Sequence, residues 1–462
     1  MMNDELLQRL LQRTLSNGGA YADIFVERRL TTAVQMEDNR IERVLSGSLA
    51  GVGIRLIHEG KTAYAYSNDF SESNLLAVAE TVSKAATLPS GAPAVDLKRR
   101  YPEVSFTIAM PPEAVPLADK VALVSAANEA ARSVDQRIRQ VTVLYRDSVQ
   151  SVTIAASDGT VAEDNRVHTM GIVQVVAADG ARIQTGYEPL GGHIGYELFE
   201  GHALEQAAVK AARRAVLMLT ARRAPGGRMP VIISSEAGGT MIHEAIGHGL
   251  EADLAQRGLS VYSGKLGQRV ASPVITVLDD ATLPNKRGSF RFDDEGTPAQ
   301  RNVLVKEGVL KQFMYDRATA AVDGTVSTGN GRRESYEHKP IPRMTNTYIA
   351  SGAVSPEEVI RSVPRGLLVK KMGGGQVNTV TGDFVFDVQE GYLIENGAAL
   401  EPVRGATLTG SGPAVLQSID MVASDLGFSI GTCGKDSQGA PVSDAMPTLR
   451  IPEMVVGGEV RE

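Results

Sequence analysis

Hydrophobic and polar positions alternate over long stretches in the first half of the chain. Leucines at helical spacing predict an opening helix, and one-sided apolar positions predict three more, giving helices at 4–17, 72–86, 117–134 and 201–219. Period-two alternation predicts strands at 22–28, 32–35, 40–45, 51–58, 61–66, 138–145, 148–155 and 160–178. A loop rich in Pro, Gly and Ala is expected from Pro89 to Pro93. The first half is therefore expected to form a sheet with helices on one face.

The second half has shorter strand patterns. They predict strands at 230–234, 274–279, 303–306, 309–315, 346–349, 368–372, 383–387 and 390–394, and a helix at 356–362. An Arg/Pro/Gly stretch around Pro225 predicts a domain boundary there. We therefore expect an α+β fold with mixed or antiparallel sheets: an N-terminal α+β domain over 1–224 and a β-rich C-terminal domain over 225–462.

Composition narrows the functional classes. The 462 residues carry a net charge of −7, and aromatic residues make up only 5%, without tryptophan. Neither a surface for polyanions nor a platform for stacking bases is indicated, so direct nucleic-acid binding is disfavoured. The sequence shows neither a secretory signal nor an apolar run of about 18 residues, so we expect no membrane span and a cytoplasmic location. The single cysteine excludes an intrachain disulfide.

The segment His243-Glu244-Ala-Ile-Gly247-His248 carries the most informative chemistry. Two imidazoles can hold a divalent transition metal, and a carboxylate beside them can act as a base on water, as in zinc hydrolases. The histidines are five residues apart, which on a regular helix separates them by roughly 140°. A π-helical turn would bring both rings to one side, and Gly247 would ease it. The alternative is two ordinary helix histidines.

Cys433 is a candidate third ligand. Glycines flank it closely, and Lys435 would favour the thiolate, which is a good zinc ligand. The alternative is a small buried hydrophobic residue. Oxygen ligands could instead come from Glu251, Asp253 or the acidic run 293–295, although that run more commonly forms a solvated turn.

Two glycine-containing segments also suggest interactions. The segment 329–334 places Arg332 and Arg333 beside a glycine turn, where they could capture a carboxylate or form surface ion pairs. The segment 373–376, Gly-Gly-Gly-Gln, could admit a substrate backbone or bring two protein segments together. The remaining histidines lack ligand spacing, and no Gly-x-Ser-x-Gly elbow supports a serine hydrolase.

Several separated motifs together resemble the TldD branch of the TldD/TldE (PmbA) metallopeptidase family. They span the second half of the chain in family order, at 243–251, 293–296, 328–335, 342–346, 373–376 and 433–435. The resemblance implies zinc bound by His243, His248 and Cys433 on a metal-binding helix of the C-terminal domain, with Glu244 as the catalytic residue. It also implies small or unfolded peptides as substrates, and a dimeric chamber built with a metal-free TldE-like paralogue or with a second copy.

A second hypothesis belongs to another class. The protein could be a non-catalytic modulator or assembly protein with a structural metal, since members of this family have been discussed as modulators of DNA gyrase and of toxin–antitoxin systems. A site closed by four protein ligands would favour that hypothesis. The presence of Glu244, which is not expected to bind the metal, favours catalysis.

Overall fold

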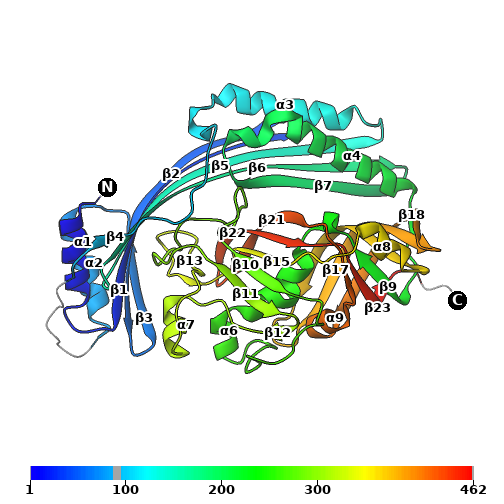
Figure 1. Ribbon diagram of the computed structural model, residues 1–462. Helices are drawn as coiled ribbons and strands as arrows, with labels where there is room; N and C mark the ends of the chain where they lie inside the picture. The colour runs from blue at the N-terminus through cyan, green and yellow to red at the C-terminus, as the bar shows by residue number, and fades with distance from the viewer. Residues whose placement is uncertain (1, 87–94, 460–462) are drawn as a thin grey trace.

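The computed structural model describes residues 2–86 and 95–459, so the loop expected at Pro89–Pro93 lies outside it. The first half forms a long, curved seven-stranded sheet, in the order β3-β2-β1-β5-β6-β4 with β7 also pairing with β6 (Figure 1). Its strands are β1 (Tyr21–Glu37), β2 (Arg40–His58), β3 (Lys61–Ser67), β4 (Lys98–Arg99), β5 (Ile138–Ala156), β6 (Thr160–Asp179) and β7 (Arg182–His193). All pairings in it are antiparallel except that of β4.

Two pairs of helices cover this sheet. Helices α1 (Asp4–Thr14) and α2 (Glu72–Ser83) pack their apolar residues against one end. Helices α3 (Leu117–Arg132) and α4 (Ala203–Thr220) lie across the other end (Figure 1). The helical patterns thus predict all four helices, each ending within a few residues of the expected position.

The sequence predicted a break in β5, but the strand is continuous from Ile138 to Ala156. The break was expected because Arg146 and Asp147 interrupt the apolar pattern. Asp147 is nevertheless buried, since its carboxylate accepts hydrogen bonds from Lys120 and from the Tyr145 hydroxyl, each at 2.6 Å. Because the Asp147 charge is compensated within the core, the strand continues through this position.

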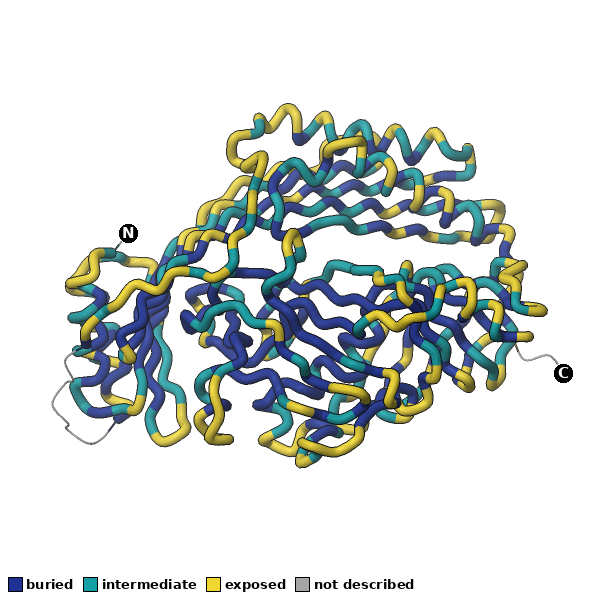
Figure 2. The backbone as a smooth tube through the Cα atoms, viewed as in Figure 1, coloured by how far each residue is buried: buried dark blue, intermediate teal, exposed yellow. Residues whose placement is uncertain are grey.

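The second half contains three further sheets, of eight, six and two strands, and a large apolar core that lies among the two larger ones (Figure 2). The eight-stranded sheet comprises β8 (Arg222–Arg223), β9 (Gly227–Ile233), β16 (Arg365–Val377), β17 (Asp383–Glu395), β18 (Ala398–Arg404), β19 (Ala406–Ser411), β20 (Met421–Val422) and β23 (Leu449–Gly457). The six-stranded sheet runs β12 (Val309–Leu310), β11 (Arg301–Lys306), β10 (Val277–Asp280), β15 (Asn346–Ile349), β22 (Gln438–Met446) and β21 (Gly427–Lys435), so that β21 lies at one edge.

Short elements complete this half. They are β13 (Gly331–Arg332), β14 (Ile341–Pro342), α5 (Thr240–Ile242), α6 (Ala252–Gln256), α7 (Arg317–Val322), α8 (Pro356–Arg361) and α9 (Gly412–Ser418). The strand predicted at 309–315 ends at Leu310, and the two predicted at 383–387 and 390–394 are one strand, β17. The glycine run 373–376 lies in β16, where a Cβ on Gly375 would fall 1.8 Å from the Phe386 ring. That run therefore brings two protein segments together.

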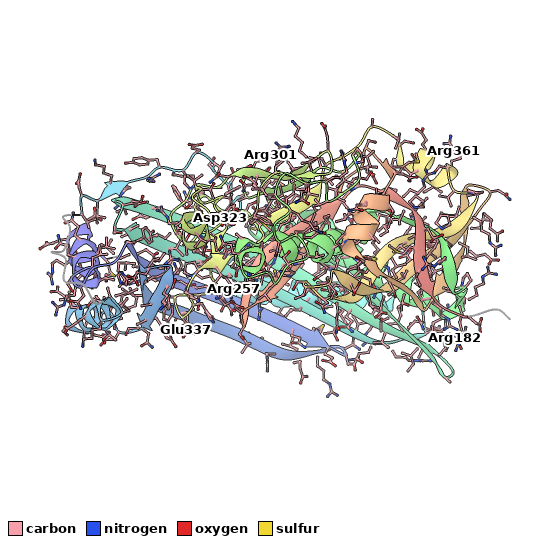
Figure 3. All side chains as sticks on the ribbon, turned by 90° about the horizontal axis from the view of Figure 1, so that it is seen from below. Arg182, Arg257, Arg301, Asp323, Glu337 and Arg361 are labelled. Atoms are coloured by element: carbon pink, nitrogen blue, oxygen red, sulfur yellow. The ribbon has the colours of Figure 1, made fainter. Side chains whose placement is uncertain are left out.

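The acidic run 293–295 does not form a solvated turn. Asp293, Asp294 and Glu295 are all buried. Glu295 pairs with Arg55 of β2 at 2.6 Å, and Asp294 pairs with Arg166 of β6 at 2.6 Å. These ion pairs join the first sheet to the second half of the chain. By contrast, the charged residues labelled in Figure 3, such as Arg257, Arg301 and Glu337, are exposed.

The fold is α+β, as the sequence predicts, with mixed and antiparallel sheets. Within residues 2–86 and 95–459, none of the helices has the length and apolar character that crossing a membrane requires.

Candidate metal centre

The segment that carries both motif histidines is a distorted helix in the core of the second half. It follows β9 and α5, and it contains a π-helical turn over His243–Gly247 and then a 3-10 turn over His248–Leu250. The backbone N–H of His248 donates to the carbonyl of His243, which is an i to i+5 hydrogen bond. The distortion expected from the five-residue spacing is therefore confirmed.

Two neighbours favour this turn. The hydroxyl of Tyr262 donates to the carbonyl of Ala245 at 2.9 Å, which satisfies a carbonyl inside the widened turn. Gly247 packs against Met344, and a Cβ at position 247 would lie 2.2 Å from the Met344 sulfur. Glycine is therefore required for close packing, in addition to any backbone freedom that it supplies.

The turn brings His243 and His248 together with Cys433 of the edge strand β21. One ligand atom from each residue lies within 4.8 Å of the others. The Cys433 Sγ lies 3.5 Å from Nε2 of His248, and the two imidazole rings are perpendicular, with centroids 5.0 Å apart. Two imidazoles and a thiolate are a donor set that suits zinc, and a fourth position remains for water or substrate.

Electrostatics keep the cysteine in its ligand form. Burial raises the pKa of the Cys433 thiol, but hydrogen bonds from His243 and His248 outweigh it and lower the pKa to about 5. These contacts favour the thiolate, which is the species that binds metals. They also raise the pKa of both imidazoles, so metal binding would release protons from the rings.

The rival oxygen ligands lie one layer further out. Glu251 accepts a hydrogen bond from Nδ1 of His248 at 3.1 Å and lies 3.3 Å from the Lys435 ammonium. Asp253 pairs with the same ammonium at 2.6 Å. Burial raises the pKa of Glu251, but the charges of Lys435 and His248 and the hydrogen bond from His248 together outweigh it, and the pKa falls to about 2. Both carboxylates therefore orient the site and are not part of the three-residue cluster.

Asp444 also belongs to this outer layer, although no sequence motif points to it. One carboxylate oxygen accepts hydrogen bonds from the Gly239 N–H, at 3.1 Å, and from the Ser429 hydroxyl. The other oxygen lies 3.7 Å from Nδ1 of His243, a buried nitrogen without a hydrogen-bond partner among the described residues. Asp444 lies in a long buried strand, where a single carboxylate has no distinguishing spacing.

Glu244 lines the same cavity as His243, His248 and Cys433, together with residues of β16 and β21. The cavity has a volume of about 360 Å³, and the Glu244 side chain is only half-buried in it. In the described part of the chain its carboxylate makes no hydrogen bond or ion pair, unlike that of Glu251. This carboxylate is therefore free to exchange a proton with a molecule in the cavity.

Sequence profiles of three domains match this chain in order. PmbA/TldA metallopeptidase domain 1 matches residues 22–86, the central domain 111–219, and the C-terminal domain 226–458. The chain belongs to the TldD/PmbA family of metallopeptidases. A metalloprotease TldD homologue of Haemophilus influenzae is 38% identical over 95% of this chain and 93% of its own. A zinc metalloprotease TldD homologue of Saccharolobus solfataricus is 30% identical over 70% of this chain and 72% of its own.

Solved structures share the TldD/PmbA fold. A candidate modulator of a DNA gyrase from Thermotoga maritima has a TM-score of 0.82 at 22% identity and covers 98% of this chain and 100% of its own. TldE from Thermococcus kodakarensis has a TM-score of 0.80 at 19% identity, with 98% and 99% covered. At these identities the likeness concerns the fold. The enzyme class, a metallopeptidase, comes from the family profiles and the curated relatives.

Proposed function

We propose that this protein is a zinc-dependent peptidase of the TldD type that hydrolyses small or unfolded peptides. The observation that carries the proposal is the convergence of two imidazoles and a thiolate beside a half-buried carboxylate in one cavity. Three protein ligands leave a fourth position open, which is typical of catalytic zinc sites and not of structural ones.

Each residue has a role in this proposal. His243, His248 and Cys433 would hold the zinc, which supplies a Lewis acid for the scissile carbonyl and lowers the pKa of water. Glu244 accepts the proton of the attacking water on its carboxylate and then delivers it to the leaving amine. Glu251 holds the His248 ring by its Nδ1, which fixes the tautomer that leaves Nε2 facing Cys433.

The proposal extends to the assembly. Residues 1–224 and 225–462 act as two domains of a subunit that forms a dimeric chamber, with a metal-free TldE-like paralogue or with a second copy. The likeness to TldE supports the first arrangement. A cytoplasmic location suits this enzyme, because a reducing compartment preserves a thiolate ligand.

Glu244→Gln tests the proposal. The substitution removes the base and leaves all three ligands, so zinc content should be unchanged while hydrolysis of an unfolded peptide falls by roughly 10²–10⁴-fold. Zinc would be measured by atomic emission on the same sample used for turnover. Near-normal turnover would reject Glu244 as the base.

Chelation separates this proposal from that of a non-catalytic modulator. Removing the metal should abolish hydrolysis while circular dichroism shows a retained fold, and added zinc should restore activity. If neither the protein alone nor the protein with a TldE-like paralogue hydrolyses an unfolded peptide when zinc is bound, the metal is structural and the modulator hypothesis holds.

A further inference from the structure

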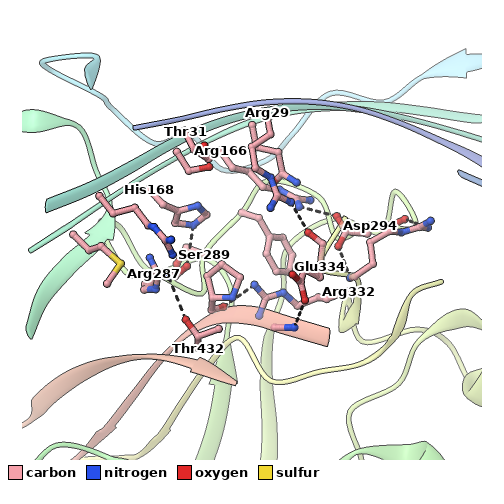
Figure 4. Close-up of a pocket in the computed structure, with 18 of the residues that line it drawn as sticks. Arg29, Thr31, Arg166, His168, Arg287, Ser289, Asp294, Arg332, Glu334 and Thr432 are labelled. Atoms are coloured by element: carbon pink, nitrogen blue, oxygen red, sulfur yellow. Dashed lines mark hydrogen bonds and ion pairs between the residues drawn. The ribbon is translucent and has the colours of Figure 1, made fainter. Parts of the chain in front are cut away.

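A second cavity lies between the first sheet and the second half of the chain, and arginines dominate it (Figure 4). It has a volume of about 360 Å³ and receives side chains from β1, β5, β6, β21 and the loop before Asp293. The acidic residues in its lining are Asp294 and Glu334. The arginines in its lining are Arg29, Arg146, Arg166, Arg287, Arg332 and Arg333.

Three of these arginines already have carboxylate partners. Arg29 pairs with Glu27 at 2.6 Å, and Arg166 pairs with Asp294 at 2.6 Å. Arg333 contacts Asp23 at 3.5 Å and donates to the Asp294 carbonyl at 2.8 Å. Of the two alternatives for this segment, ion pairing therefore describes Arg333, although the pair is buried and not at the surface.

The other three have no carboxylate partner among the described residues. Arg287 is 9% exposed and donates to the Gly431 carbonyl at 3.2 Å and to the Thr432 hydroxyl at 3.4 Å. Arg332 is also buried and donates to the backbone carbonyls of Met344 and Pro441. Arg146 is exposed at the cavity. A buried guanidinium bound only by neutral groups loses hydration without gaining a counter-charge, which an anionic ligand would supply.

The electrostatic environment agrees with this geometry. Burial lowers the pKa of Arg287 to about 10, and the charge of Arg146 contributes in the same direction. Burial also lowers the pKa of His168, which faces the same cavity, well below its usual value, and the neighbouring arginines add to the effect. The cavity therefore favours an anion and disfavours any further positive charge.

This cavity adjoins the metal centre. Thr432 lines both cavities, and the next residue, Cys433, is one of the three candidate ligands. Thr432 also contacts Arg287 directly, and Figure 4 shows the two side chains close together. Successive side chains of a strand point to opposite faces, so Thr432 faces Arg287 whereas Cys433 faces His248. A group held by Arg287 would thus lie on the other side of the edge strand β21 from the metal cluster.

We propose that this cavity, defined by Arg146, Arg287 and Arg332, binds a carboxylate of the peptide substrate. The inference rests on the proposed peptidase function for the identity of the ligand, because peptides carry carboxylates and the guanidinium group binds them bidentately. The carboxylate comes from the peptide C-terminus or from an Asp or Glu side chain of a peptide that passes the edge of β21. The cavity thereby selects peptides that carry a negative charge.

Binding to the zinc-loaded Glu244→Gln protein provides the test, because it does not depend on turnover. The probes are four fluorescein-labelled decapeptides of otherwise neutral sequence: the free acid, its C-terminal amide, and amides with one internal Glu or Gln. Fluorescence anisotropy should show the free acid or the Glu peptide binding about ten-fold more tightly than its neutral counterpart, as expected for one charge-assisted contact. The pair that shows the difference identifies the source of the carboxylate.

Arg287→Met in the same background should remove this preference and leave the affinity of the neutral peptides unchanged. Arg257→Met is the matched control, because it removes the same charge from an exposed position outside the cavity, and it should keep the preference. If Arg287→Met does not fold by circular dichroism, the exposed Arg146→Met decides, and it should reduce the preference several-fold.

Equal binding of all four peptides, or a preference that survives in the cavity variants, would overturn the inference. That result would leave the peptidase proposal intact if the protein with Glu244 still hydrolyses the peptides. Conversely, Arg287→Met could remove the preference although the protein with Glu244 hydrolyses no peptide. That result would support carboxylate binding in the cavity and reject the peptidase proposal.

Discussion

At the scale of single residues, the centre depends on a cysteine held by two histidines. The Cys433 thiolate carries the negative charge of the three-residue cluster, and it would offset one of the two charges of a bound divalent metal, which two neutral imidazoles leave uncompensated. The residues around it are already committed elsewhere, since Glu251 and Asp253 pair with Lys435. Neither of these two carboxylates is therefore free to replace the thiolate.

Cys433→Ser should consequently cause severe loss of metal. A neutral hydroxyl is a far poorer zinc ligand than a thiolate. Loss of a residue that only hydrogen-bonds to a ligand lowers metal affinity by roughly 10–100-fold, and loss of the thiolate itself should lower it further. Zinc content after exhaustive dialysis measures this effect. Ser437→Ala, in the exposed turn that follows β21, should retain its zinc. Full occupancy in Cys433→Ser would place the third ligand elsewhere.

Asp316, the N-cap of α7, makes stability depend on pH. Burial raises its pKa to about 6, and the charge of Glu295 adds to the shift. Because the folded-state pKa lies above the unfolded one, ionisation opposes folding as the pH rises from about 4 to 6. Asn keeps the cap without the charge. The stability of Asp316→Asn relative to the native protein should therefore increase by about 2 kcal/mol between pH 4 and pH 7.

Urea unfolding at several pH values measures this difference between the two proteins. Asp436→Asn, an exposed substitution in the turn between β21 and β22, should show no such trend. A difference between native and Asp316→Asn protein that stays constant across this range would contradict the assignment.

At the scale of elements, the π-helical turn is the feature on which the histidines depend. It was predictable because two candidate ligands five residues apart conflict with regular helical geometry. Its supports were not predictable, since Tyr262 and Met344 come from distant segments. The same limit applies to β7, which the sequence did not predict. Gly186 and Gly192 weaken its strand pattern, but they are needed where α4 and the loop at Asn285 approach the backbone.

Gly247→Ala should destabilise both the fold and the site. The added methyl would lie 2.2 Å from the sulfur of Met344, a fully buried side chain, so the core must shift. Overpacking of this kind costs about 1–3 kcal/mol, and the displaced turn should also weaken zinc binding. Thermal unfolding and zinc titration measure the two effects.

Two comparisons check the cause of the Gly247→Ala effect. Gly374→Ala adds the same methyl where no atom lies within 4 Å, and it should be close to neutral. In a Met344→Ala background, the cost of Gly247→Ala should shrink. An equal cost in both backgrounds would show that the clash with Met344 is not responsible.

At the scale of the whole molecule, buried ion pairs hold the first sheet against the second half. The sequence reveals these acids and arginines but not their pairing, because Arg55 and Glu295 are 240 residues apart in the chain. The three candidate ligands, by contrast, were predictable because their residue types are rare and their motifs specific. The residue types and motifs point to the three candidate ligands. The contacts that support them depend on packing between distant segments, which no local sequence pattern records.

Arg55→Met should weaken this junction strongly. Arg55 is 1% exposed and pairs with both Asp23 and Glu295. Its removal leaves the buried Glu295 without an ion-pair partner among the described residues, and leaves Asp23 with only the longer contact to Arg333. Such a loss costs about 3–5 kcal/mol, measurable by urea unfolding. The exposed pair between Arg13 and Glu80 offers a control, since Arg13→Met should cost no more than about 1 kcal/mol. Similar costs for both substitutions would refute a structural role for the buried network.

The distance along the chain between the histidines and Cys433 has a consequence for biosynthesis. Cys433 follows His248 by 185 residues, so at roughly 5–20 residues per second a ribosome takes roughly 10–40 s to reach it after making the histidine pair. During that interval the nascent chain lacks the thiolate, and the edge strand that carries it has yet to be translated. The three-residue centre can therefore assemble only after translation has passed Cys433, which delays the onset of activity until the whole segment from the histidine pair to β21 has been synthesised.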